Sequence, residues 1–299
     1  MKPRILITGS GGMLGIDLAR ELGKGYEVIG TDIVRNPKSV VHKFYKADVT
    51  SLRQMKAVVG KAMPDIVIHT AAWTDVDGCE LRSKKAYRIN TGGAKNAALA
   101  CRSSGAGLVY ISTDFVFDGR KKRPYRESDK TGPLNVYADS KLKGEFAVKK
   151  TLKRYLILRT GWLYGKHGRN FVDTIAATAG RDGLLRVVDD QVGSPTYTVD
   201  LAKAIRALLG RIGSKPDALS SKAFGTYHIS NSGRVSWYEY AKTILRFSGI
   251  KAEVAPISSR ELGRPARRPA MSVMDNSKFG KTAGYRMRGW KSALREYLN

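Results

Sequence analysis

The sequence predicts an α/β protein: a Rossmann-like, doubly wound parallel sheet with a smaller, interleaved C-terminal substrate lobe. Three observations predict this class. Short apolar runs alternate with helix-like segments, a glycine-rich turn follows the first run, and polar residues recur where the runs end. Alternation at this spacing favours parallel strands with helices on both faces of the sheet. Ligands bind such sheets beyond the carboxyl ends of the strands.

The first half of the chain carries the clearest alternation. Its β-branched apolar runs predict strands at 5–7, 28–30, 66–69, 108–112 and 156–159. Amphipathic segments predict helices at 14–22, 52–61, 86–103 and 136–150. Because the glycine turn and several polar residues follow these strands directly, motif and topology predict the same ligand site.

The second half is less regular and predicts the second lobe. We expect a strand at 186–188, a helix at 199–209 returning to the sheet, a Gly/Ser/Lys-rich loop at 212–222, a strand at 225–230, a helix at 237–248 and a Pro/Arg-rich segment at 263–269. Irregular structure of this kind suits a lobe that closes over a substrate. The predicted division is 1–163 and 184–212 for the NAD(P)-binding Rossmann domain, with 164–183 and 213–299 forming the substrate-binding lobe.

The charge balance is strongly basic, with 53 Lys and Arg against 26 Asp and Glu, a net charge of +27. Nucleic-acid binding is one interpretation of such a surface. The basic residues are nevertheless dispersed, without a basic tail, zinc-finger spacing or aromatic-basic RNA signature. We therefore expect no specific nucleic-acid partner and a solvated basic surface that attracts anionic phosphate ligands.

Other composition features exclude several classes. No apolar run approaches the roughly 18 residues needed to span a bilayer, so no membrane partner is expected. The first residues are typical of a strand and turn rather than a signal peptide, and a cytoplasmic location is expected. Cys79 and Cys101 are not in a Cys-x-x-Cys pair, which excludes disulfide scaffolds and zinc ribbons. The four histidines lack metal-ligand spacing, so no metal site is predicted.

The glycine turn consists of Gly9, Gly12 and Gly15, with Gly11 between them. Small residues let backbone amides and the following helix N-terminus approach a pyrophosphate. This spacing is looser than the Gly-x-Gly-x-x-Gly dinucleotide fingerprint, and an ordinary strand–helix turn is the alternative.

Two acidic residues follow the next strands. Asp32 ends the second strand, where an acid can bond the adenosine ribose hydroxyls and favour NAD, although Arg35 could meet a 2′-phosphate instead. A surface aspartate in a turn is the alternative interpretation of Asp32. Asp48 and Val49 could hold the adenine, or Asp48 or Thr50 could cap the next helix.

Tyr137 and Lys141 lie four residues apart, on one face of a predicted helix. A cation beside a phenol lowers its pKa, which lets the phenol exchange a proton near neutral pH. An exposed tyrosine beside a solvated lysine is the alternative. Thr113, at a strand end upstream, could donate a hydrogen bond to the same carbonyl oxygen, and the three together indicate redox chemistry on a carbonyl or alcohol.

Longer segments carry a family resemblance through nearly the whole chain. They are 68–77, 112–119, 133–141, 190–196 and 265–272. With the glycine turn, they resemble the extended short-chain dehydrogenase/reductase superfamily and, within it, the dTDP-4-dehydrorhamnose reductase family. The resemblance implies NADPH- or NADH-dependent reduction of the C4 carbonyl of dTDP-4-dehydro-β-L-rhamnose to dTDP-L-rhamnose.

The resemblance also implies site residues. Thr113, Tyr137 and Lys141 form the implied catalytic set, and Thr113, Asp114 and Trp162 meet the sugar. The implied cofactor contacts, together with Gly9 from the turn, are Gly12, Met13, Leu14, Asp32, Asp48, Val49, Ala72, Trp73, Thr74, Tyr137 and Lys141. Some family members are described with Mg²⁺ at a dimer interface. No acidic cluster here supports Mg²⁺, and a homodimer stays open.

Two alternatives to this function remain. One is another nucleotide-sugar epimerase, reductase or dehydratase of the same superfamily; a dehydratase usually has Thr-Asp-Glu, whereas Phe115 follows Thr113 and Asp114 here. The other is a non-catalytic regulatory subunit resembling the β subunit of methionine adenosyltransferase, which uses the same scaffold.

Overall fold

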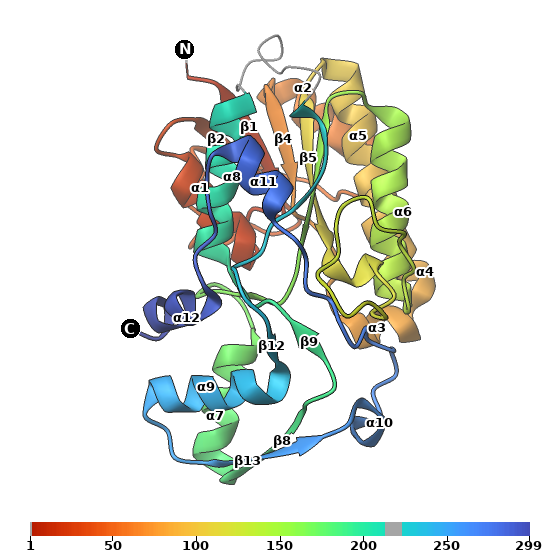
Figure 1. The fold of residues 1–299 in the computed structure, drawn as a ribbon. Helices are drawn as coiled ribbons and strands as arrows, with labels where there is room; N and C mark the ends of the chain where they lie inside the picture. The colour runs from red at the N-terminus through yellow and green to blue at the C-terminus, as the bar shows by residue number, and fades with distance from the viewer. Residues whose placement is uncertain (1, 213–222) are drawn as a thin grey trace.

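A central parallel sheet organises the computed structural model, which describes residues 2–212 and 223–299 (Figure 1). Its strand order is β11-β6-β5-β4-β1-β2-β3, and the register is parallel throughout. The order reverses between β1 and β4, the position where doubly wound sheets bind ligands. This architecture confirms the predicted fold class. The strands are β1 (Arg4–Thr8), β2 (Glu27–Asp32), β3 (Lys43–Lys46), β4 (Ile66–His69), β5 (Gly107–Thr113), β6 (Tyr155–Thr160) and β11 (Gly225–His228).

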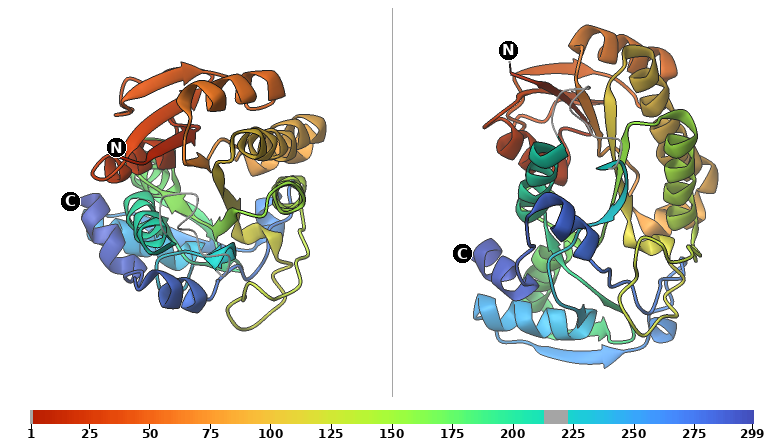
Figure 2. Two further views of the ribbon diagram at one scale, coloured as in Figure 1. Left: turned by 90° about the horizontal axis from the view of Figure 1, so that it is seen from above. Right: turned by 45° about the horizontal axis from the view of Figure 1, so that its top comes forward.

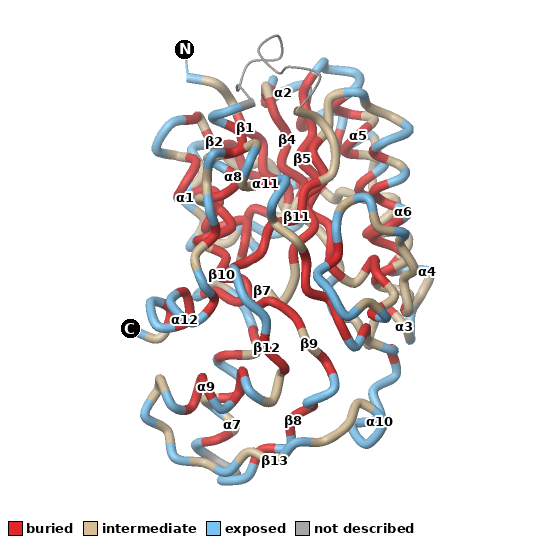
Figure 3. Tube along the Cα trace, in the orientation of Figure 1, coloured by how far each residue is buried: buried red, intermediate tan, exposed pale blue. Residues whose placement is uncertain are grey.

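Helices cover both faces of this sheet (Figure 2). Ile5 and Ile7 pack into the apolar cluster on one face, whereas Leu6 packs into the cluster on the other. Successive strand residues point to opposite faces, so a run buried on both sides is continuously apolar. Figure 3 shows the resulting buried strands between partly exposed helices. One face carries α1 (Met13–Leu22), α8 (Thr198–Ile212) and α11 (Ser277–Ala283); the other carries α2 (Leu52–Ala62), α5 (Gly93–Ser104) and α6 (Val136–Thr151).

Smaller elements form a second group below the sheet in Figure 1. Its core is rich in aromatic side chains, including Tyr164, Tyr240 and Trp290. Among the helices of the described residues, none is both long and apolar enough to cross a membrane. The group contains α7 (Phe171–Asp182), α9 (Trp237–Ser248), α10 (Ser259–Leu262), α12 (Trp290–Leu298) and the strand pairs β8 (Leu184–Val188) with β13 (Glu253–Ile257), β7 (Leu163–Tyr164) with β10 (Thr196–Tyr197), and β9 (Val192–Gly193) with β12 (Val235–Ser236).

Two strands pair differently from the predicted division. β8, predicted in the Rossmann domain, pairs with β13 in the second group. β11, predicted in the substrate lobe, pairs with β6 and extends the central sheet. Strand pairing depends on contacts distant in sequence, which local patterns do not encode. The predicted loop at 212–222 lies, beyond residue 212, outside the described residues, and the lobe boundaries stay a prediction.

The helix predicted at 86–103 is interrupted. The structure has α4 (Ser83–Ala86), a π-helical turn (Tyr87–Gly92) and then α5. Asn90, buried within the wider turn, accepts from the Trp73 amide at 2.8 Å and donates to the Trp73 carbonyl and the Ser140 hydroxyl. Such π-turns occur often at functional sites. Here the turn lets one side chain fix the backbone of the loop after β4.

Candidate active site

One cavity of about 780 Å³ opens at the carboxyl ends of β1, β4 and β5. Its position matches the ligand site expected for this topology. Every site residue proposed from the sequence lines it. These residues are Gly9, Gly12, Met13, Leu14, Asp32, Asp48, Val49, Ala72, Trp73, Thr74, Thr113, Asp114, Tyr137, Lys141 and Trp162.

The glycine turn forms one wall almost entirely from backbone. Gly9 has a φ of +69°, and a Cβ there would lie 2.8 Å from the Ala71 nitrogen. A Cβ on Gly15 would lie 2.2 Å from the Gly9 carbonyl oxygen. Gly12, the N-cap of α1, has no side chain to occupy the first helical amides. The turn therefore fits an anionic pyrophosphate, which backbone amides at a helix N-terminus favour.

The acids after β2 and β3 have distinct local roles. Asp32 accepts hydrogen bonds from the amides of Gly11 at 3.1 Å and Ile33 at 2.8 Å, which hold its carboxylate beside the glycine turn. Asp48 accepts from the Thr50 amide at 2.8 Å. The alternative that Asp48 or Thr50 caps α2 is wrong, because Ser51 is the N-cap and accepts from Gln54. Asp48 remains a cavity residue.

Lys141 is almost fully buried on α6. Its Nζ donates to the Ile111 carbonyl at 2.6 Å and lies 4.4 Å from the centroid of the Tyr110 ring. Burial lowers the pKa of Lys141 to about 7, and the Glu145 carboxylate partly opposes this by favouring the ammonium. The side chain is thus poised to change charge near neutral pH.

The pKa of the Tyr137 phenol is shifted in the direction opposite to the one expected from the sequence. We expected the neighbouring ammonium to lower its pKa, but burial raises the pKa well above the usual 10. A hydrogen bond with Thr113 lowers it, while the charges of Asp114 and Cys79 raise it further. The prediction was wrong because it considered only helix spacing. Desolvation dominates in this wall, and the Lys141 ammonium is already bound by a carbonyl.

Asp114 is a buried acid next to Thr113. Burial raises its pKa to about 6, against lowering by hydrogen bonds that include those from Ser272 and Thr113. The Thr113 hydroxyl donates to Asp114 Oδ1 at 3.1 Å. Gly161 leaves room for the carboxylate, because a Cβ there would lie 2.3 Å from Asp114 Cγ. Thr113, Asp114 and Tyr137 therefore form one coupled polar group.

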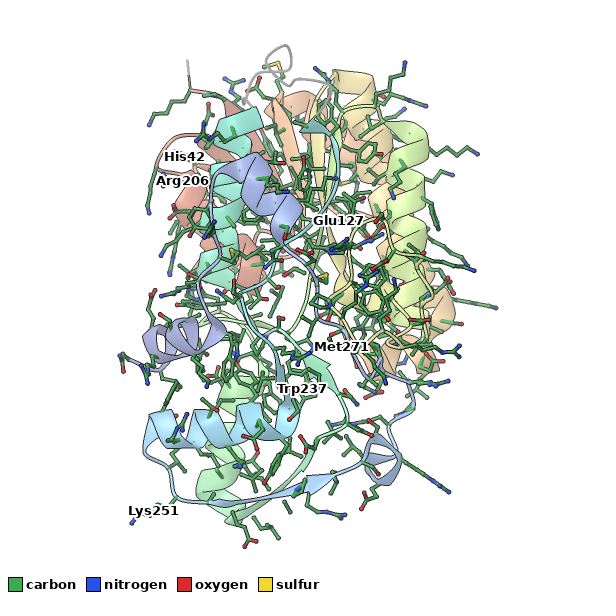
Figure 4. All side chains as sticks on the ribbon, viewed as in Figure 1. His42, Glu127, Arg206, Trp237, Lys251 and Met271 are labelled. Carbon is green, nitrogen blue, oxygen red and sulfur yellow. The ribbon has the colours of Figure 1, made fainter. Side chains whose placement is uncertain are left out.

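Trp162 forms the far wall of the cavity with a residue that the sequence analysis missed. Its backbone has a φ of +51°, which is unusual for a bulky residue. Its ring stacks on Trp237 with a centroid separation of 3.4 Å and an interplanar angle of 1°. Figure 4 labels Trp237 at the N-terminal end of α9. Gly193 makes room, since a Cβ there would lie 2.2 Å from the Trp162 ring.

Three cations also line the cavity without having been predicted: Lys85, Arg88 and Arg169. Lys85 Nζ lies 4.5 Å from the centroid of the Trp73 ring. These three residues form no spaced motif that predicts a binding site. The overall excess of positive charge was the one feature of the sequence that pointed to cations near an anionic ligand. Within the described part of the chain, no three His, Cys, Asp or Glu residues gather in a way that could hold a metal ion.

Fold and cavity together define a class: an α/β dinucleotide-binding protein with a Tyr-x-x-x-Lys pair, typical of extended short-chain dehydrogenases/reductases. The family model described as "RmlD substrate binding domain" matches residues 1–299. The chain belongs to the dTDP-4-dehydrorhamnose reductase family of that superfamily.

Individual relatives match over nearly their full length. Spore coat polysaccharide biosynthesis protein SpsK of Bacillus subtilis strain 168 is 42% identical over 99% of this chain and 96% of its own. A dTDP-4-dehydrorhamnose reductase of Streptomyces griseus is 39% identical, covering 99% and 93%. The crystal structure of dTDP-4-dehydrorhamnose reductase from Bacillus anthracis strain Ames in complex with NADP aligns with a TM-score of 0.90 at 38% identity. That alignment covers 100% of this chain and 99% of the other.

Proposed function

We propose that this protein is an NAD(P)H-dependent oxidoreductase that reduces the C4 carbonyl of dTDP-4-dehydro-β-L-rhamnose to give dTDP-L-rhamnose. The observation that carries the proposal is that Thr113, Tyr137 and Lys141 line the same cavity as the glycine turn. Full-length similarity to reductases of this substrate supports the choice of sugar. The NADP bound in the Bacillus anthracis structure supports the choice of cofactor.

The glycine wall would hold the dinucleotide. Gly9, Gly12 and the residues after them would take the pyrophosphate, and Asp32 the adenosine ribose. Asp48 and Val49 would hold the adenine, whereas Ala72, Trp73 and Thr74 would lie along the nicotinamide half with Lys141. When bound, the reduced nicotinamide supplies the hydride that the carbonyl carbon accepts.

Tyr137 would supply the proton. Because its raised pKa keeps the phenol protonated at neutral pH, it can act as the general acid for the developing alkoxide at C4. The Thr113 hydroxyl, which donates to Asp114 in this structure, would turn to donate a hydrogen bond to the same oxygen. As the phenolate forms, the Lys141 ammonium would stabilise it, and Lys141 would also hold the nicotinamide ribose. The buried setting strengthens each of these interactions.

The remaining cavity residues would bind the nucleotide sugar. Asp114 and Trp162 would contact the sugar, and the Trp162–Trp237 stack offers a flat apolar face. Lys85, Arg88 and Arg169 would balance the negative charge that two pyrophosphates bring into one cavity.

The test is the absorbance of reduced nicotinamide with purified protein alone. We expect NADPH or NADH to be consumed only when a dTDP-4-keto-6-deoxysugar is present, with one equivalent of alcohol formed. An epimerase would interconvert sugars without net consumption of the cofactor. A regulatory subunit would bind the dinucleotide without consuming it. Either result across a panel of keto-sugar nucleotides would overturn the proposal.

A further inference from the structure

We propose that Glu145 is a positioning residue for this reaction: its buried carboxylate ties the end of β5 to α6 and sustains the positive charge of Lys141. The inference rests on the proposed function for its kinetic consequences. Its structural part stands on the hydrogen bonds of Glu145 with Ser112 and Arg159, neither of which belongs to the proposed catalytic set.

Glu145 is completely buried and accepts three close hydrogen bonds. Its Oε1 accepts from the Ser112 hydroxyl at 2.6 Å and from Arg159 Nε at 2.9 Å. Its Oε2 accepts from Arg159 Nη2 at 2.7 Å. The guanidinium is therefore bidentate, the geometry that gives the strongest and most directional ion pairs. Lys149 Nζ lies farther away, at 3.9 Å.

The spacing along α6 connects this ion pair to the cavity. Tyr137, Lys141 and Glu145 follow one another at four-residue intervals and so lie along one helix face. Lys141 binds the Ile111 carbonyl, and Glu145 binds the hydroxyl of the next residue, Ser112. Two successive residues at the end of β5 are thus tied to two successive turns of α6.

This tie fixes the position of Thr113. The side chains of neighbouring strand residues leave opposite faces of β5, and the Ser112 hydroxyl is anchored on α6 by Glu145, while both Ser112 and Thr113 line the cavity. The separation between the Thr113 hydroxyl and the Tyr137 phenol depends on how β5 sits against α6. Small errors in such a separation cost large factors in rate. Glu145 holds this geometry without touching the reacting atoms.

Stability alone is a poor reason for a charge pair at this depth. Burying two ions is costly, and well-packed apolar residues in their place are often equally stable or better. Arg159 also donates towards His228 Nε2 at 3.5 Å, while His228 Nδ1 donates to the Tyr125 carbonyl at 3.1 Å. Burial lowers the pKa of His228 to about 3, so this imidazole adds no charge. The Glu145 carboxylate is therefore paired with the Arg159 guanidinium, and it also favours the ammonium form of Lys141.

The groups facing Lys141 make Glu145 electrostatically important. Tyr110 on β5 and Tyr137 on α6 have raised pKa values, and both are neutral at pH 7. Burial and the Lys141 charge lower the pKa of His69 on β4 to about 3, so this ring is neutral too. Glu145 favours the ammonium against the effect of burial. If Glu145 carried no charge, the Lys141 ammonium would lose its proton at a lower pH.

The test compares Glu145→Gln with the natural chain in two measurements. In the cofactor-free protein, the ¹³Cε resonance of Lys141, assigned by its absence in Lys141→Met, should titrate about one pH unit lower in the variant. In turnover, the alkaline limb of the kcat profile should move down by a similar amount, about tenfold in rate on that limb. The KM values for dinucleotide and keto-sugar should stay within about twofold.

Matched variants separate positioning from general damage. Asp139→Asn removes an acid from the same helix, where it pairs with the exposed Lys143 at 2.9 Å, and should leave both profiles unchanged. Ser112→Ala keeps the Glu145 charge but removes one tie; it should lower kcat without moving the alkaline limb. If Glu145→Gln fails to fold, Glu145→Gln combined with Arg159→Met removes both buried charges together. Because the loss of the Arg159 cation partly offsets the loss of the carboxylate, the Lys141 titration should still move to lower pH, but by less than is expected for the single variant.

The outcomes are decisive in both directions. An unshifted Lys141 titration together with a loss of rate that is equal at every pH would overturn the proposal and leave Glu145 a purely structural partner of Arg159. The resonance titration needs no substrate. Absent turnover in the natural chain would therefore count against the proposed reaction, and an unshifted resonance against the role of Glu145.

Discussion

Two walls of the cavity differ in the groups that they present: one presents backbone amides, and the other presents ionisable side chains. The glycine wall, residues 9–15, binds through backbone and holds no ionisable group at the cavity surface. The acid–base wall consists of Thr113, Asp114, Tyr137 and Lys141, and its ionisable groups have pKa values moved by burial. Under the proposed function, the first wall would recognise the shape and charge of the dinucleotide with fixed dipoles, whereas the second would carry out proton transfer.

The two walls also differ in what destabilises the folded protein. In the acid–base wall it is the burial of ionisable groups. Burial disfavours the charged form of every ionisable group in the acid–base wall, because desolvation is the first cause in each case. Active sites often accept lower stability in exchange for such tuning. The glycine wall has a steric cost instead, since it excludes even a single Cβ at two positions.

The strongest way to break the acid–base wall is Tyr137→Phe. We expect kcat to fall on the order of 10³-fold, because the general acid is lost. Dinucleotide affinity, measured by fluorescence or calorimetry, should change by less than about twofold, since the glycine wall is intact. Tyr87→Phe is the control, because its hydroxyl donates to Asp139 outside the cavity. Turnover that persists in Tyr137→Phe would remove the phenol from the mechanism.

Asp114→Asn should reveal the cost of burying a carboxyl group. The folded-state pKa of Asp114 is raised from its usual 3.8 to about 6. Between these values the unfolded chain releases a proton that the folded chain keeps, so the free energy of unfolding falls as pH rises. The loss is about 3 kcal/mol at most and is complete above pH 6.

Denaturant unfolding should therefore find Asp114→Asn more stable than the natural chain by about 1–3 kcal/mol near pH 8. The advantage should shrink towards zero below about pH 4, where Asp114 is protonated in both states. A stability difference independent of pH would contradict burial as the cause of the shift.

Gly15→Ala tests the steric cost of the glycine wall. Its Cβ would meet the Gly9 carbonyl oxygen at 2.2 Å, so the turn must shift. We expect a loss of about 1–3 kcal/mol in stability and at least about tenfold in dinucleotide affinity. Gly60→Ala is the matched control, because it lies within α2 with open space around its Cβ position. It should stabilise by about 0.5–1 kcal/mol.

Asp32→Asn should give the smallest effect and sharpen cofactor choice. The substitution keeps the shape of the side chain but removes a charge beside the proposed adenosine ribose site, which should lower the repulsion towards a 2′-phosphate. The ratio of kcat/KM for NADPH over NADH should rise about fivefold, the equivalent of about 1 kcal/mol between exposed charges. An unchanged ratio would show that Asp32 does not contribute to this preference.

Sequence patterns were reliable where the physics is local. The helix at 237–248 matches α9 at both ends, and the strand at 66–69 matches β4. The glycine turn and the Tyr137–Lys141 pair were recognisable because each is a short-range spacing. Trp237 was missed as a cavity residue because its ring meets Trp162 only through the tertiary fold. The π-helical turn around Asn90 was missed for the same reason.

The sequence by itself determined which chemical groups this protein can bring to a cavity and which strand ends present them, because periodicity and short spacings follow from the geometry of helices and strands. Tertiary structure decided the protonation behaviour of those groups. Burial sets the pKa of Lys141 and Glu145 partly opposes it, while Glu145 itself binds Ser112 on β5 and Arg159 on β6, and the burial depends on segments that are distant along the chain. Desolvation is a property of the whole surrounding volume, so no local pattern could report it.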